Sequence, residues 1–316
     1  MKRKRWINLS SILLPIVLIL FSCTIETAQP PLKKKLVVVS DYLYPTDTTL
    51  FASFINKQNV SISIQNLSTD KIIGHVRNFG NNSGFDIVIL RSMYDAYKLN
   101  KRDILHDIKV NKEENKYLYS SSFHNFYGFG IDPYIILNSD SNRYRLTTYN
   151  DLTNHSFINL LDERELTPFL SPVKEKMKRV QANNWIKKFL GHAYSPKNLS
   201  DSLHLVAPIL TTAAKWDSLQ KVAFYKNRKA YYPNKKSTGS FFNIRTIGII
   251  KQAENYVLAQ KFISHFLTEV NNFHINKSLG TFSIFEKNGT FRKYGTRFEK
   301  LMEHYIVTDR TVLRFQ

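Results

Sequence analysis

Short apolar runs alternate with segments of helical spacing between residues 35 and 100. Apolar runs and period-two alternation predict strands at residues 35–40, 60–67 and 85–91. Apolar positions three and four residues apart predict helices at residues 49–58, 69–80 and 93–100. This alternation of strand and helix predicts a parallel sheet with helices on its faces.

Two polar loops follow the first and third of these strands. Because ligands of such sheets bind outside the carboxyl ends of the strands, we expect the two loops to form a binding site. The expected ligand-binding residues here are Asp41, Tyr42, Tyr44, Arg91 and Ser92. The alternative is that the tyrosines only cover a strand end with their rings, and that Arg91 is a surface ion-pair partner.

The second half of the chain continues with further strand and helix patterns. Strands are expected at residues 126–138, 156–163 and 202–210, with two more inside residues 221–251. A short capped helix is expected at 147–153, a long amphipathic region at 171–194 and one amphipathic helix at 253–276. The acids of residues 161–167 are interpreted as a solvated loop or helix surface.

Thr211 and Thr212 end the strand expected at 202–210. They are candidate ligand contacts, because the N-terminus of the helix that follows favours an anion. The alternative is that their hydroxyls only cap that helix. Trp216 is expected in the core.

The N-terminus has the order of a secretory signal. Four basic residues precede an apolar core at residues 7–21, which is shorter than a membrane-spanning helix. The residues Leu20 to Cys23 resemble a bacterial lipobox, so we expect a signal peptide at 1–22, a lipid on Cys23 and a tether at 23–35. The alternative is an uncleaved N-terminal anchor. Both place the chain in the cell envelope, on the extracytoplasmic side of a membrane in the periplasm or at the cell surface.

Cysteine usage and charge narrow the function. Cys23 is the only cysteine, so the exported part must fold without disulfides. The net charge is +20, and without the signal 41 basic residues face 25 acidic ones, a net charge of +16. This favours anionic partners, and the scattered basic residues argue against nucleic acid. The sequence has no His-x-x-x-His, no Gly-x-Ser-x-Gly and no phosphate loop, so we expect no enzyme.

Several segments together resemble the periplasmic ferric-iron-binding proteins, extracellular solute-binding proteins of ABC transporters. They are residues 36–54, 70–90, 96–108 and 126–154, and residues 232–255 with Pro233, Asn234, Gly239, Asn243, Gly248 and Lys251 at the family's spacing. The resemblance implies an α/β, two-lobed periplasmic-binding-protein-like fold of type 2. Each lobe would be a mixed sheet flanked by helices, joined by crossover strands and closing on a ligand. The implied lobes are residues 36–125 plus 242–285 and residues 126–241 plus 286–316.

The residues at the family's metal-binding positions differ from the family's ligands. The position of its first-loop His or Tyr falls on Leu43, so that Tyr42 or Tyr44 is the candidate metal ligand there. The acidic position falls near Lys71, and the tyrosine pair falls on Thr211 and Thr212. Ferric iron prefers anionic oxygens. We therefore expect a lost or rebuilt ferric site.

The cationic residues Arg91, Lys71 and Lys215 favour an anion, or Fe(III) carried as an anionic chelate. Two functions follow. The first is a lipid-anchored receptor that delivers iron, an iron chelate or another small anionic solute to an ABC permease. The second is a degenerate relative that acts as a structural or interaction component of an envelope complex.

Overall fold

The computed structural model describes residues 34–109, 125–139, 145–194, 207–213, 215–216, 227–234 and 240–283. The expected signal peptide, Cys23, the expected tether up to residue 33, residues 235–239 and the end of the chain from 284 lie outside these residues. Within the described ranges, no helix is long and apolar enough to cross a membrane.

The first sheet begins with three parallel strands, as the sequence predicts. Strand β1 (Lys35–Ser40) lies between β2 (Ser61–Asn66) and β3 (Ile87–Leu90) and pairs in parallel with both. Strand β10 (Phe242–Ile250) then pairs antiparallel with β3. The sheet is therefore mixed, and the carboxyl ends of β1 and β3 lie next to each other.

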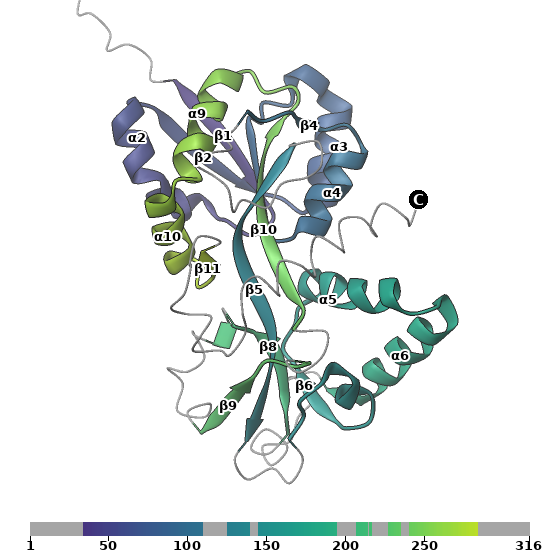
Figure 1. The fold of residues 1–316 in the computed structure, drawn as a ribbon. Coiled ribbons are helices and arrows are strands. Elements are labelled where there is room, and N and C mark those ends of the chain that lie inside the picture. Colours follow the sequence, from purple (N-terminus) through teal and green to yellow (C-terminus); the bar gives the residue numbers. More distant parts are fainter. Residues whose placement is uncertain are drawn as a thin grey trace, which may run out of the picture. The chain divides into compact units, whose positions relative to one another are not determined.

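Helices cover both faces of the first sheet (Figure 1). One face carries α3 (Thr69–Phe79), which continues into η2 (Gly80–Asn82), and α4 (Met93–Lys101). The other face carries η1 (Pro45–Phe51), α2 (Ala52–Gln58), α9 (Tyr256–Phe266) and α10 (Glu269–Ser278). On this second face Phe51 and Phe54 pack edge-on against Phe262, with ring centroids 5.2 and 5.1 Å apart.

The prediction of a single helix at residues 253–276 is wrong, because the structure has two helices there. Helix α9 is capped by Leu267, and Thr268 has extended backbone angles that break the helical ladder. The Thr268 hydroxyl donates to the His265 carbonyl and accepts from the Asn271 side chain. Local hydrogen bonds of this kind offer the backbone an alternative to the helix.

Strand β5 (Phe126–Ser139) takes part in both sheets. Its first half pairs antiparallel with β10, and its second half pairs with β8 (Ile209–Thr212) and β9 (Arg228–Tyr231). Beyond β8 lie β6 (Phe157–Asn159) and β7 (Ala193–Tyr194), both parallel to their neighbours. The short strands β4 (Leu105–His106) and β11 (Phe282–Ser283) pair with β10 and β5.

The helices of the second sheet also differ from the sequence prediction. The 3-10 helix η3 (Tyr149–Thr153) is capped by Thr148 as expected. In place of one amphipathic region at 171–194, the chain forms α5 (Glu163–Lys176) and α6 (Arg179–His192). Helix α5 starts eight residues earlier than predicted, inside the stretch interpreted as a solvated surface. This earlier start brings its acids into the candidate site.

Strands β5 and β10 form the connection between the two sheets (Figure 1). Their register runs from Phe126 opposite Gly248 to Pro133 opposite Phe242, with an irregularity between Arg245 and Thr246. Bulges of this kind twist a strand and change the direction in which its side chains point. Arg245 therefore lies where the paired strands pass from one sheet toward the other.

Candidate functional site

The two polar loops predicted from the sequence meet at the ends of β1 and β3. Asp41 is buried, and its Oδ1 accepts a hydrogen bond of 2.8 Å from the Arg91 backbone N–H. Asn243 of β10 donates from its Nδ2 to the Arg91 carbonyl at 2.9 Å. The backbone of Arg91 is thus held from both sides, which fixes the direction of its side chain.

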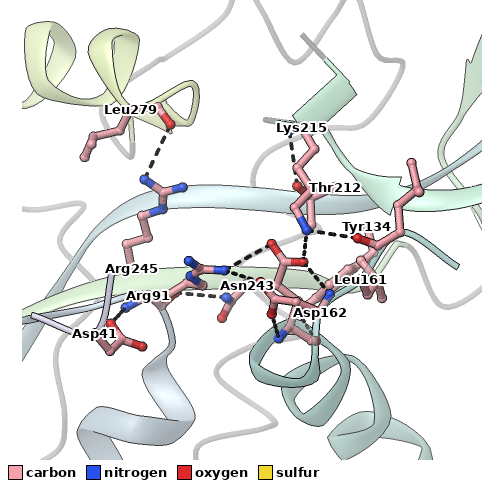
Figure 2. Close-up of polar contacts among 12 residues, drawn as sticks. Asp41, Arg91, Tyr134, Leu161, Asp162, Thr212, Lys215, Asn243, Arg245 and Leu279 are labelled. Carbon is pink, nitrogen blue, oxygen red and sulfur yellow. Dashed lines mark hydrogen bonds and ion pairs between the residues drawn. The ribbon is translucent and has the colours of Figure 1, made fainter. Parts of the chain in front are cut away.

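The Arg91 side chain points to the N-terminus of α5 and binds two acids there (Figure 2). Its Nη1 lies 2.8 Å from Asp162 Oδ2 and 3.5 Å from Glu165 Oε1. Arg91 follows a strand of the first sheet, and α5 packs on the second sheet. The contact therefore bridges elements of both sheets.

A capping box positions these two acids. Asp162 accepts from the Glu165 backbone N–H, and Glu165 accepts from the Asp162 backbone N–H, both at 3.0 Å. Glu165 is only 5% exposed, so its interpretation as a solvated surface acid is wrong. The spacing Asp-x-x-Glu before an apolar segment is a capping-box signal, and it would have located α5 from the sequence.

Lys215 completes the cluster from the other side of Glu165. Its Nζ contacts Glu165 Oε2 and donates to the Leu160 carbonyl at 2.9 Å. The Lys215 backbone N–H donates to Thr212 Oγ1, which is the capping contact that the sequence offered as the alternative to a ligand role. Glu165 therefore lies between two cations, Arg91 and Lys215.

The charges of the cluster stabilise one another. Burial alone would lower the pKa of Arg91, but Asp162, Glu165 and Asp41 outweigh it, so the pKa is raised and the guanidinium stays charged. Burial opposes ionisation of Asp162, but Arg91 outweighs it with help from the Glu165 N–H and Lys215, so the pKa of Asp162 is lowered. Arg91 and Asp162 are therefore both charged at neutral pH.

Tyr42 lies beside two arginines. Its ring is 5.9 Å from the guanidinium carbon of Arg91 and 4.8 Å from that of Arg245, a residue of β10 that the sequence analysis did not single out. Burial raises the pKa of Tyr42, and Arg245 opposes that effect only in part. The phenol is therefore neutral. Its hydroxyl is shielded from solvent and has no well-placed acceptor within the described residues.

The other expected ligand residues lie in different surroundings. Tyr44 is 59% exposed, and its backbone N–H is bound by Asp47 at the start of η1. Ser92 is buried and caps α4 by accepting from the Tyr94 N–H. Thr211 is buried in β8, where its hydroxyl forms no hydrogen bond to any described residue. Lys71 is exposed on α3, and Trp216 is buried as predicted.

The chemistry of the cluster suits an anion better than a bare metal ion. In the described part of the chain, no three His, Cys, Asp or Glu side chains come together as a metal site. Of the acids at the cluster, Asp162 and Glu165 pair with cations, and Asp41, which accepts from a backbone N–H, also acts on Arg91 through its charge. Arg91, Lys215 and Arg245 are suited to carboxylate or phosphate groups.

No protein-family model matches this sequence, and no curated protein matches it either. Solved structures do resemble the fold. IdiA (FutA) from Trichodesmium, in complex with iron and citrate, aligns with a TM-score of 0.69 at 17% identity, over 89% of this chain and 98% of that protein. The ferric binding protein from Campylobacter jejuni gives 0.72 at 15% identity, over 87% and 99%.

Iron-bound HitA from Pseudomonas aeruginosa gives a TM-score of 0.70 at 13% identity, over 88% of this chain and 98% of that protein. Structural similarity at identities this low shows the fold and does not show which ligand this chain binds. The fold prediction is confirmed: a mixed α/β structure in which helices flank the sheets. The chain therefore has the two-lobed fold of the periplasmic ferric-binding proteins.

Proposed function

We propose that this chain is an extracytoplasmic solute-binding protein rather than an enzyme. It is held to a membrane by a lipid on Cys23 and delivers its solute to an ABC-type permease. The solute is iron, an iron chelate such as a ferric carboxylate, or another small anion, and it binds at the cluster around Asp41, Tyr42 and Arg91. The proteins of similar fold named above include one that holds iron together with citrate.

The observation that carries the proposal is the position of Arg91. It stands at the carboxyl end of a parallel strand, where sheets of this kind bind ligands. Its side chain reaches the second sheet's α5 at 2.8 Å, so a ligand that binds there contacts both halves of the fold. Contact with both halves is what closes a hinged binding protein on its solute. The predicted ligand roles of Ser92, Thr211 and Thr212 belong to the same proposal.

A thermal-shift screen of the full-length protein in detergent tests the proposal. Ferric citrate, free citrate, phosphate and ferric ion with a weak chelator are compared at matched ionic strength. A ligand at a hundred times its Kd stabilises the native state by about 2.7 kcal/mol, which is readily measured. A dose-dependent rise in melting temperature with one of them supports the receptor. The proposal fails if none stabilises the protein and no solute co-purifies from the cell envelope.

One observation favours the second candidate function, an interaction or structural component of an envelope complex. Asp162 and Glu165 already neutralise Arg91, and Glu165 also holds Lys215, so internal groups take the place of a ligand anion. A protein locked by its own acids needs no solute. Affinity purification then decides: a stoichiometric envelope partner together with a flat ligand screen supports this function, and a ligand-dependent shift argues against it.

A further inference from the structure

Arg245 differs from the other cations of the cluster because no ion pair joins it to a described carboxylate. Arg91 and Lys215 both bind carboxylates, whereas Arg245 forms no ion pair with any described residue. Its Nη1 donates to the Leu279 carbonyl at 3.5 Å, the limit of such a contact (Figure 2). Its Nε is shielded from solvent and has no acceptor in the described part of the chain.

Tyr42, the neighbour of Arg245, also carries a buried polar group without a well-placed acceptor among the described residues. The guanidinium carbon of Arg245 lies 4.8 Å from the centre of the Tyr42 ring, and Arg245 acts on the Tyr42 hydroxyl through its charge and a side-chain hydrogen bond. That hydroxyl is itself a donor, and it is the group that is buried without a well-placed acceptor among the described residues. Buried donors are normally paired, because an unpaired one loses its hydration and gains nothing in return. A buried Tyr42 donor without a well-placed acceptor, beside a guanidinium that forms no ion pair with a described carboxylate, indicates a missing acceptor that is negatively charged.

The backbone places this pair at the end of β1 and at the irregularity of β10, the strand that with β5 connects the two sheets. Tyr42 follows β1, and Arg245 lies at the irregularity of β10, opposite Gly130 of β5. Arg245 is partly exposed, unlike the buried residues of β10 on either side of it. Arg245 and Arg91 both lie beside the Tyr42 loop, at 4.8 and 5.9 Å from the same ring.

We propose that Arg245 and Tyr42 form an oxyanion subsite that takes a carboxylate or phosphate group of the solute. The planar fork of Arg245 makes two hydrogen bonds to such a group, and the Tyr42 hydroxyl donates a third. This inference rests on the proposed solute-binding function and assigns its ligand class to two residues. Arg91, which Asp162 and Glu165 already partner, also holds α5 beside this subsite.

Calorimetric titration of the full-length protein with citrate, and separately with inorganic phosphate, tests the subsite. Replacing Arg245 by Gln should weaken binding of the preferred anion about 10- to 100-fold, because charge-assisted hydrogen bonds disappear. Tyr42→Phe should weaken it less, by about 3- to 10-fold. The matched control is Arg102→Gln, which removes the same charge from an exposed position on the first sheet's side of the chain and should leave affinity unchanged.

Arg245→Lys guards against misfolding of the Gln variant, because it keeps the charge and removes the fork. Affinity between those of the wild-type protein and Arg245→Gln supports the subsite. The inference is overturned, and the receptor function kept, if an anion binds equally well to wild type and Arg245→Gln, or if only free ferric ion or a neutral solute binds. If the wild-type protein binds no solute, the inference and the proposed function fall together. Comparing citrate with phosphate identifies the kind of oxyanion.

Discussion

Glu165 is the residue on which the polar cluster depends most. It is buried, it accepts from the Asp162 N–H, and it contacts both Arg91 and Lys215. Replacing it by Gln keeps the shape but removes the charge that both cations face. Because hydrogen bonds to charged groups are stronger than neutral ones, we expect Glu165→Gln to lower the free energy of unfolding by about 1–3 kcal/mol in urea denaturation.

The same helix offers a matched control for this change. Glu163 lies in the first turn of α5, two residues from Glu165, and is exposed. Glu163→Gln removes the same charge from the same helix end and should change the stability by less than about 0.5 kcal/mol. Equal destabilisation by the two variants would contradict a specific role of Glu165.

Asp162 gives the stability of the protein a pH dependence. Its pKa in the folded state is lowered, mainly by Arg91 acting against burial. A lowered folded-state pKa contributes stability above the unfolded-state pKa of about 3.9, and this contribution is lost as the pH falls through the folded-state value. The side chain is 48% exposed, so we expect less than about 1 kcal/mol.

The stability difference between wild type and Asp162→Asn should therefore be largest near neutral pH and shrink as the pH falls below about 5. Chemical denaturation at several pH values measures it. In an Arg91→Gln background the same substitution should show much less pH dependence, because the partner that lowers the pKa is gone. An undiminished dependence there would assign the effect to another group.

For the polar cluster, the sequence predicted that residues following parallel strands lie close together. Asp41 and Arg91 are brought together, since the ends of β1 and β3 are neighbours in the sheet. It did not predict which acid faces Arg91, because Glu165 is far along the chain and its burial depends on how α5 packs. Arg245 was missed for a similar reason: a single arginine in an apolar strand gives no signal of an unpaired charge.

At the level of elements, strands and short helices with clear end signals were predicted best. Helix α3 ends at Gly80, which has a φ of 53° that glycine adopts easily. Two long amphipathic stretches were harder to predict, because the helical spacing continues across a break. The breaks at Met177–Lys178 and at Thr268 have extended backbone without glycine or proline, so only packing and local hydrogen bonds mark them.

Gly130 of β5 is required by the close approach of α10. A Cβ at this position would lie 2.1 Å from Asn276 Oδ1. Asn276 cannot easily move, because its amide donates to the Phe129 carbonyl and its Oδ1 accepts from Thr281. We expect Gly130→Ala to destabilise the protein by about 1–3 kcal/mol, as overpacking does in other cores.

At Gly74 we expect replacement by alanine to have the opposite effect on stability. It lies inside α3, and a Cβ there would meet nothing within 4 Å. Gly74→Ala should stabilise the protein by about 0.5–1 kcal/mol, because alanine loses less backbone entropy in a helix. Thermal unfolding of both variants measures the contrast, and a stabilised Gly130→Ala would show that α10 adapts.

For the molecule as a whole, lipid attachment and the lobe boundaries inferred from the sequence stay predictions. If Cys23 carries the lipid, Cys23→Ala should abolish fatty-acid labelling and release the protein from the membrane fraction. Ser11→Ala, inside the apolar part of the signal, should leave both unchanged. Continued membrane retention of Cys23→Ala without labelling would instead support an uncleaved N-terminal anchor.

The ion pair between Arg91 and the acids of α5 has a consequence for selectivity among solutes. Any ligand that needs this guanidinium must exchange places with a carboxylate that is already there. Exchanging one carboxylate for another yields little free energy, because the new hydrogen bonds resemble the ones that they replace. A solute with a single negative group is thus handicapped at this position, and one whose several charges also engage other cations overcomes the competition.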